Sequence, residues 1–269
     1  MTAAGSRTCA VTGLHLVPAA GDVAYRIAKD RYGALTARTN NVVGPWPIGP
    51  AGSPADARGR FDTIGTTIYL ADSRECSYAE VLVGFRQERA AIAHVAELIG
   101  CHPDEYVARV EAEAEANQTS VPWSIDVDWQ MARSIYEITL PRAGWWVQID
   151  HPDTLAAIER ITDPVTGYTE RLRMMTEARV MEGDRALTTL VANAIRGQVL
   201  DDGSEALGIS FRSKTSFGRC WAYWDRRADI GLEPGSNDLV QCESWNVGPD
   251  PTFHSITDHY GLRILDARP

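Results

Sequence analysis

Residues 59–83 run Gly-Arg-Phe-Asp-Thr-Ile-Gly-Thr-Thr-Ile-Tyr-Leu-Ala-Asp-Ser-Arg-Glu-Cys-Ser-Tyr-Ala-Glu-Val-Leu-Val, and three local patterns follow one another along them. The Ile-Gly-Thr at 64–66 predicts a turn, because glycine takes the positive φ that tight turns require. The β-branched and aromatic residues at 67–71 predict a short buried strand. An Asp-Ser pair at 72–73 offers N-cap oxygens, with Glu75 at capping-box spacing, so we expect a helix to follow directly.

One face of that helix is small and apolar except for a single carboxylate. Cys76, Ala79, Glu80 and Val83 recur at i, i+3, i+4 and i+7, so they share this face. A carboxylate on a buried helix face must be paired, protonated or catalytic. From the helix pattern alone, Glu80 is therefore either one half of a structural ion pair with an arginine or a functional group.

Other fragments stand in a fixed order around this stretch. They are Tyr-Arg-Ile-Ala at 25–28, Gly-Ile-Ser-Phe-Arg-Ser at 208–213 and Cys-Trp-Ala-Tyr-Trp at 220–224. Together with Gly-Arg-Phe, Tyr-Leu-Ala and Ala-Glu in the central stretch, they resemble the RES-domain family. The resemblance covers roughly residues 20–85 and 135–230. The chain departs from the family pattern at Phe61, where Trp is frequent, and at Arg212, where Pro is common.

The resemblance implies a fold and an activity. RES proteins resemble ADP-ribosyltransferases, so we expect an α+β protein with a compact split β-sheet core and no Rossmann fold. We expect one RES-like domain over residues 1–269, with a helical insertion at about 86–134. Many members of the family are toxins that deplete NAD and are held in check by an antitoxin protein.

The resemblance also implies that five residues of this chain form an NAD site. Arginine forks suit a pyrophosphate, and an aromatic ring such as that of Tyr69 can stack on the flat, cationic nicotinamide. Cleavage of the N-glycosidic bond leaves an oxocarbenium-like ribose, and we expect Glu80 to stabilise this cation. Ser213 is expected to bind the ribose or orient Glu80, unless it only caps the backbone at a strand end. The expected catalytic residues are Glu80, Tyr69 and Ser213, and the expected NAD-binding residues are Arg26, Arg60, Tyr69 and Ser213.

Three functions compete for this site. The first is an NAD-consuming enzyme that cleaves the nicotinamide bond by hydrolysis or phosphorolysis. The second is an ADP-ribosyltransferase that modifies a protein or a small molecule, with the helical insertion as an acceptor platform. The third is a RES-like binding module without catalysis. The sequence contains no Gly-x-Gly-x-x-Gly, Gly-x-x-x-x-Gly-Lys, His-Glu-x-x-His or Gly-x-Ser-x-Gly motif. It therefore lacks the motifs expected of a dinucleotide-binding dehydrogenase, a nucleotide triphosphatase, a zinc peptidase or a serine esterase.

The composition limits the partners and the location. A formal net charge of −10 argues against a nucleic-acid or anionic-membrane surface. Five cysteines without a Cys-x-x-Cys pair, and no apolar leader, predict a cytoplasmic protein with reduced thiols. We expect NAD as the substrate, no metal, and a partner or second copy of the chain on the helical insertion.

The remaining segments carry weaker expectations. Residues 1–21 are expected to lie loosely against the body, with His15 as a packing or surface histidine, since no second ligand stands at metal spacing. Residues 33–58 form a long Gly/Pro-rich loop with Trp46 between two prolines, which either closes over NAD or pins the loop to the core. The apolar runs at 135–140 and 145–149 predict paired strands.

Overall fold

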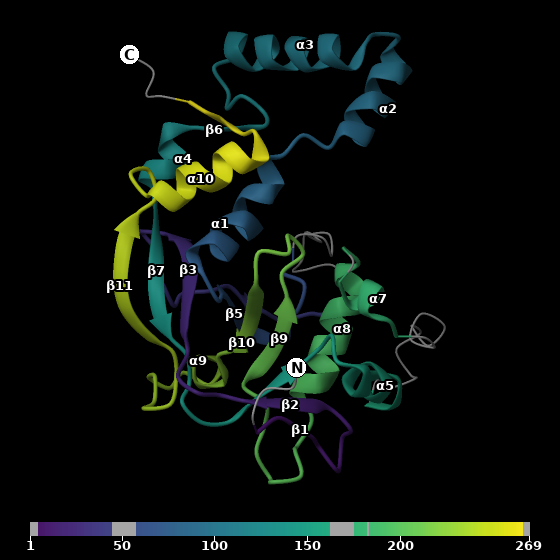
Figure 1. The fold of residues 1–269 in the computed structure, drawn as a ribbon, viewed down its shortest axis with the longest axis vertical. Helices are drawn as coiled ribbons and strands as arrows, with labels where there is room; N and C mark the ends of the chain where they lie inside the picture. Colours follow the sequence, from purple (N-terminus) through teal and green to yellow (C-terminus); the bar gives the residue numbers. More distant parts are fainter. Residues whose placement is uncertain (1–4, 45–57, 162–174, 182, 266–269) are drawn as a thin grey trace.

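A ten-stranded mixed sheet forms the centre of the molecule (Figure 1). The structure is a computed structural model that describes residues 5–44, 58–161, 175–181 and 183–265. In chain order the strands are β1 (Arg7–Thr8), β2 (His15–Pro18), β3 (Val23–Lys29), β4 (Thr39–Asn40), β5 (Gly65–Ala71), β6 (Ser124–Ile125), β7 (Arg133–Thr139), β8 (Trp145–Gln148), β9 (Gly208–Arg212), β10 (Arg219–Trp224), β11 (Val240–Asn246) and β12 (Arg263–Ile264).

The large sheet has two parts that meet at one residue pair. Its strand order is β1-β2-β8-β9-β10-β5-β3-β7-β11, with β4 paired to β5, and β12 and β6 form a separate sheet. Within each part the ladders are long, since β10 pairs with β5 at five positions and β3 with β7 at seven. Between β5 and β3 the only pair among the described residues is Tyr25 with Ala71. The strands therefore diverge on either side of that pair.

Helices cover this sheet on different sides of the junction. The helices are α1 (Arg74–Leu82), η2 (Val83–Phe85), α2 (Arg89–Ile99), α3 (Pro103–Ala116), α4 (Val127–Met131), α5 (Pro152–Ile161), α7 (Glu177–Met181), α8 (Arg185–Arg196), α9 (Arg226–Asp229) and α10 (Pro251–Tyr260). One core cluster packs α5 and α8 against β8, β9 and β10. Another packs α1 and α10 against β3 and β7. This mixture of helices with a largely antiparallel sheet confirms the predicted α+β class.

The N-terminal segment is part of the sheet, so the prediction that residues 1–21 lie loosely against the body is wrong for its described part. β2 pairs with β8 in register Leu16 to Val147, and β1 pairs with β2. Leu14 and Leu16 are completely buried in the main core cluster. The burial of these leucines holds the segment in place.

The two apolar runs after residue 134 do form strands, but they do not pair with each other. β7 lies between β3 and β11, whereas β8 lies between β2 and β9. The chain crosses from one part of the sheet to the other between them. Adjacent runs with a turn between them usually form a hairpin, and here each run finds a partner from elsewhere in the chain instead.

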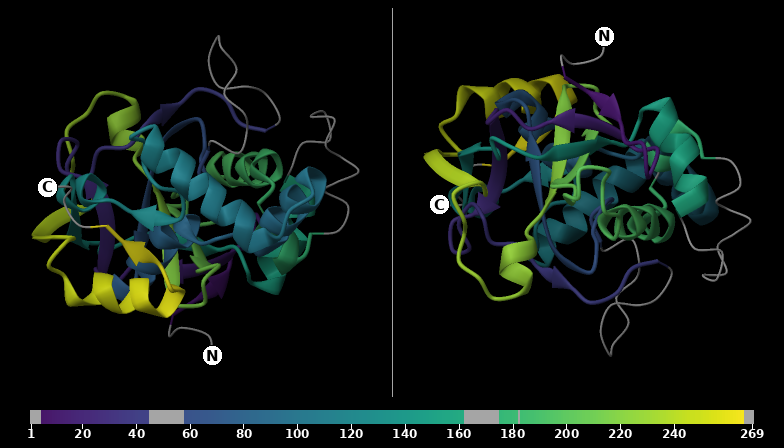
Figure 2. Two further views of the ribbon diagram at one scale, coloured as in Figure 1. Left: turned by 90° about the horizontal axis from the view of Figure 1, so that it is seen from above. Right: turned by 90° about the horizontal axis from the view of Figure 1, so that it is seen from below.

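The segment at 86–134 is mainly helical, as predicted. Gly100 ends α2 with a φ of 71°, and Pro103 opens α3 at its first position. α2 and α3 stand off the rest of the molecule in Figure 1, and seen from above α3 crosses over the body (Figure 2). The last part of the segment is helical only over the short α4, since residues 124–125 pair with β12 before α4 begins.

The fold addresses two expectations only in part: the loop around Trp46 and the absence of a membrane partner. Trp46 and half of the predicted loop around it, residues 45–57, lie outside the described residues. Among the helices that the structure describes, none has the length and apolar composition required to cross a membrane.

Candidate functional site

A cavity of about 310 Å³ lies at the junction of the two parts of the sheet. Residues from β3, β5 and α1 line it, together with one residue each from β9 and β10. Three of the five predicted site residues are in this lining: Arg26, Tyr69 and Glu80. The cavity sits where the β3–β5 ladder is reduced to one pair, so the divergence of these strands creates the space.

Helix α1 presents Glu80 to this cavity. Its N-cap is Ser73, whose side chain accepts a hydrogen bond from the Cys76 backbone N–H at 3.1 Å. Asp72, the other predicted cap, instead accepts a hydrogen bond from the backbone N–H of Arg219 at 2.7 Å. Cys76 and Ala79 are completely buried, which leaves Glu80 at the edge of the packed face.

The Glu80 carboxylate is held from one side only. Ser213 Oγ donates to Glu80 Oε1 at 2.6 Å, and the Lys214 backbone N–H donates to the same oxygen at 2.9 Å. Within the described part of the chain, Oε2 has no hydrogen-bond partner. One oxygen is therefore fixed by the protein, and the other is available to a ligand in the cavity.

Ser213 is itself positioned by the turn that follows β9. Its backbone N–H donates to the Gly218 carbonyl at 2.9 Å, and its Oγ accepts from the Thr215 backbone N–H at 3.1 Å. The side chain is buried, with 2% of the residue exposed. The structure thus brings Ser213 to Glu80, and Ser213 acts on the carboxylate by orienting it.

Tyr69 contributes its ring to the cavity wall, while its hydroxyl holds the preceding loop. The hydroxyl donates to Asp62 Oδ1 at 2.8 Å and accepts from the Phe61 backbone N–H at 2.8 Å. Burial, and then the Asp62 carboxylate, raise the pKa of Tyr69 well above its usual value. Tyr69 therefore stays protonated, and its hydroxyl is already engaged by the loop before β5.

Arg60 is a buried cation without an ionic partner in the described chain. Only 7% of the residue is exposed, and its guanidinium lies 5.9 Å from the ring centre of Phe61 and 5.8 Å from that of Phe211. Its Nη1 reaches only Met181 Sδ, at 3.9 Å, and its buried Nε has no hydrogen-bond partner. Burial lowers the pKa of Arg60 and the neighbouring cation Arg185 lowers it further, whereas the charge of Glu80 raises it. An unpaired buried cation is costly, so this environment suits an anion that arrives from outside.

Arg185 is a site residue that the sequence analysis missed. It is the first residue of α8, and its Nη1 is buried without a hydrogen-bond partner among the described residues. A cation at a helix N-terminus opposes the helix dipole, and this was the one local signal that could have drawn attention to it. Arg60 and Arg185 lie close enough for each charge to influence its neighbours, Arg185 acting on both Arg60 and Tyr69, whereas the carboxylates of Asp62 and Asp184 lie at the Tyr69 hydroxyl and at the N-cap of α8.

Arg26 is held differently from Arg60. Its guanidinium donates to the backbone carbonyls of Ala34 and Thr36, in the latter case at 3.1 Å. Burial lowers its pKa to about 10. Along β3, Arg26 alternates with Tyr25 and Ile27, which pack towards α1, so its side chain extends to the other face of the sheet. The two predicted arginines are thus not equivalent.

A pair of thiols, Cys76 and Cys220, lies at the wall of the cavity. Cys76 Sγ is 3.7 Å from Cys220 Sγ, and Cys220 also lines the cavity. The hydrogen bond to Cys76, together with burial, raises the pKa of Cys220. A raised pKa makes a thiol less available as the thiolate, so this environment does not favour Cys220 as a nucleophile.

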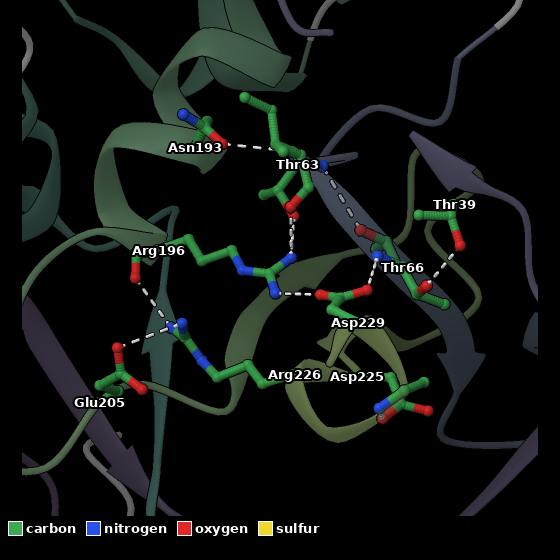
Figure 3. Close-up of polar contacts among 12 residues, drawn as sticks. Thr39, Thr63, Thr66, Asn193, Arg196, Glu205, Asp225, Arg226 and Asp229 are labelled. Carbon is green, nitrogen blue, oxygen red and sulfur yellow. Dashed lines mark hydrogen bonds and ion pairs between the residues drawn. The ribbon is translucent and has the colours of Figure 1, made fainter. Parts of the chain in front are cut away.

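A polar network anchors the start of β5, the strand that carries Tyr69 (Figure 3). Arg196, the last residue of α8, forms an ion pair with Asp229 of α9 and donates to Thr63 Oγ1 at 2.7 Å and to the Ile64 carbonyl at 2.6 Å. The second oxygen of Asp229 accepts the Thr66 backbone N–H at 2.7 Å. The network therefore fixes the chain between Arg60 and β5.

Comparison with protein-family models, with curated proteins and with solved structures gave no match.

Proposed function

We propose that this protein consumes NAD by cleaving the bond between nicotinamide and ribose. The observation that carries the proposal is the Glu80 carboxylate, which Ser213 and Lys214 hold by one oxygen in the wall of a cavity bordered by Tyr69. A fixed carboxylate beside an aromatic ring, with a nearby cation that no described residue pairs, suits a substrate with a cationic ring, a ribose and a pyrophosphate.

The size and charge of the site support binding of the nicotinamide end of NAD in the cavity. A volume of about 310 Å³ is near the lower limit of ligand pockets and suits the nicotinamide riboside half. In the proposed complex the nicotinamide stacks on Tyr69, and the pyrophosphate meets Arg60 and Arg185. Arg26 borders the cavity and ties down the backbone at residues 34 and 36.

The proposed chemistry needs a stabilised cation more than a strong acid. The C1′–N bond breaks with its electron pair moving to the pyridinium nitrogen, so nicotinamide leaves as a neutral molecule without taking up a proton. The ribose then carries oxocarbenium-like positive charge, and the free Glu80 oxygen stabilises it. Water or phosphate adds to C1′; addition of water releases one proton and yields ADP-ribose.

The architecture gives further support. A sheet whose two parts meet at a single pair, with the cavity at that junction, agrees with the split sheet of an ADP-ribosyltransferase-like core. Glu80 comes from the helix that follows β5, and Ser213 from the turn after β9. These are the positions that the RES-like motifs imply.

Transfer of ADP-ribose to an acceptor is the second candidate function. The observation in its favour is the projecting pair α2 and α3, which leaves Leu98 and Ile99 exposed by 71% and 53%. An apolar, projecting element of this kind could bring an acceptor protein to the same site.

Incubation of the full chain with NAD tests the proposal. We expect release of free nicotinamide, measured by chromatography, and the reaction is run with and without inorganic phosphate. NAD labelled in its adenylate moiety shows where ADP-ribose ends: in solution for hydrolysis or phosphorolysis, and on a macromolecule for transfer. Absence of nicotinamide release under all these conditions would overturn the enzyme proposal and favour a binding module.

A further inference from the structure

Two histidines and one aspartate meet at a place remote from the Glu80 cavity. His15 lies at the start of β2, whereas His151 and Asp153 lie at the start of α5. Their potential ligand atoms are all within 4.8 Å of one another. β2 is four strand positions from β5, about 19 Å along the sheet at ~4.8 Å per strand, so this cluster is separate from the candidate NAD site.

The most informative member is His15, because its burial is not explained by its contacts. Only 4% of the residue is exposed, and its buried Nδ1 has no hydrogen-bond partner in the part of the chain that the structure describes. The ring stacks on that of His151 with centroids 3.6 Å apart and planes 11° apart. Burying an imidazole nitrogen without a partner costs free energy. His15 is therefore a buried imidazole with a ring nitrogen left to bind something.

Asp153 completes the donor set and is already oriented. Its Oδ2 accepts a hydrogen bond from Thr8 Oγ1 at 2.5 Å and lies 3.8 Å from His151 Nδ1. Two ligand atoms on a tetrahedral metal, each at about 2.0–2.1 Å, are ~3.4 Å apart, so this separation is close to what a shared ion requires. A second partner that orients a ligating carboxylate is typical of metal sites.

We propose that His15, His151 and Asp153 form a binding site for a divalent transition-metal ion of the zinc type. Two imidazole nitrogens and one carboxylate are ligands that zinc prefers, and they leave a fourth position for water. That position faces solvent, since the side chains of His151 and Asp153 are 24% and 49% exposed. The ion ties β2, near the edge of the sheet, to α5.

Binding requires a small local rearrangement. The two rings are nearly parallel, so their nitrogen lone pairs converge on one point only after each ring rotates about its Cβ–Cγ bond. His151 Nδ1 also accepts the Asp153 backbone N–H at 3.2 Å, and a metal bond at this atom replaces that hydrogen bond. His151 and Asp153 make these changes with partly exposed side chains, whereas the His15 ring is buried.

Metal titration of the full chain, prepared without a histidine tag and freed of metal with a chelator, tests this site. We expect one equivalent of Zn²⁺ to bind by calorimetry and to raise the melting temperature. Co²⁺ should give the visible absorption of a tetrahedral complex that Zn²⁺ abolishes. His15→Gln and Asp153→Asn should each weaken Zn²⁺ binding by more than about 100-fold, since loss of even an outer-shell partner costs 10–100-fold.

Matched changes elsewhere separate this site from adventitious binding. His94→Gln and Asp104→Asn alter exposed side chains on α2 and α3 and should leave Zn²⁺ affinity unchanged. Circular dichroism confirms that each variant is folded, and Asp153→Asn, with its half-exposed side chain, keeps the test decisive if His15→Gln is unstable. Absence of stoichiometric binding, or equal affinity in the Asp153→Asn and control proteins, would overturn the proposal.

Discussion

Glu80 is the residue on which the proposed reaction depends, because it is the carboxylate in the cavity wall. Glu80→Gln keeps an oxygen that can accept from Ser213 and Lys214, so the fold and the NAD affinity should change little, the latter by no more than a few-fold. The charge that stabilises the ribose cation is lost, and nicotinamide release should nearly disappear. Loss of a preorganised electrostatic group typically costs about 2.7–4 kcal/mol of transition-state stabilisation.

Glu75→Gln is the matched control, since Glu75 lies exposed on the same helix. It should leave the rate of nicotinamide release unchanged. A Glu80→Gln protein that keeps more than about half of the wild-type rate would make Glu80 a structural residue.

Arg60 gives a prediction in which stability and binding change in opposite directions. Arg60 has no ionic partner among the described residues, so replacing this buried cation by an apolar side chain of similar length, as in Arg60→Met, should raise the melting temperature of the ligand-free protein. NAD affinity, measured by calorimetry on the Glu80→Gln background, should fall by roughly 1.5–3 kcal/mol, the value of a hydrogen bond to a charged group. Arg26→Ala on the same background measures how much the other predicted arginine contributes to NAD affinity.

Arg109→Met serves as the control, because Arg109 lies on the surface of α3 with 61% of its side chain exposed. It should affect neither quantity. A destabilised Arg60→Met protein with unchanged NAD affinity would show that Arg60 is part of the core rather than a ligand.

At the scale of elements, the position of β5 depends on one mostly buried ion pair. The side chains of Arg196 and Asp229 are 11% and 15% exposed. Gly65, predicted to take a positive φ, has a φ of 104°, and a Cβ there would lie 2.2 Å from Asp229 Oδ2. Glycine therefore lets the carboxylate approach the backbone at the start of the strand.

We expect Asp229→Ala to reduce the free energy of unfolding by about 3 kcal/mol in urea denaturation. The reason is that Arg196 loses its counter-charge and the Thr66 N–H loses its acceptor, and breaking a buried pair costs about 3–5 kcal/mol. Asp104→Ala, with 94% of the side chain exposed, should cost less than about 0.5 kcal/mol. If the two changes cost the same, the pair behaves as a surface ion pair and does not anchor β5.

At the scale of the whole molecule, the single pair between β3 and β5 makes the junction the place where a ligand can act on both parts of the sheet. In the Glu80→Gln protein, NAD at 100 times its dissociation constant should add about 2.7 kcal/mol to the free energy of unfolding. Amide hydrogen exchange should slow at residues 25–27 and 69–71, on both sides of the cavity. The β1–β2 segment is remote from the junction and should exchange at an unchanged rate; equal protection in both regions would argue against a ligand bound at the junction.

Much of the secondary structure could be predicted because its signals are local. The strand at 67–71, the cap at Ser73, the glycine that ends α2 and the proline that opens α3 each depend on residues within one or two turns of the chain. Such signals are the same in any tertiary context. The contact between Ser213 and Glu80 was one of the alternatives stated for Ser213, and it came from the resemblance of ordered motifs, since these residues are far apart in the chain and no local pattern links them.

Strand partners and buried clusters depended instead on the tertiary structure. Every strand offers the same backbone donors and acceptors, so nothing local shows that β8 pairs with β2 and β9 rather than with β7. For the same reason Arg185 could not be assigned to Arg60, nor His15 to His151. These residues meet because whole helices and strands bury their apolar faces together, and the free energy of that burial belongs to the packed molecule rather than to any short stretch of it.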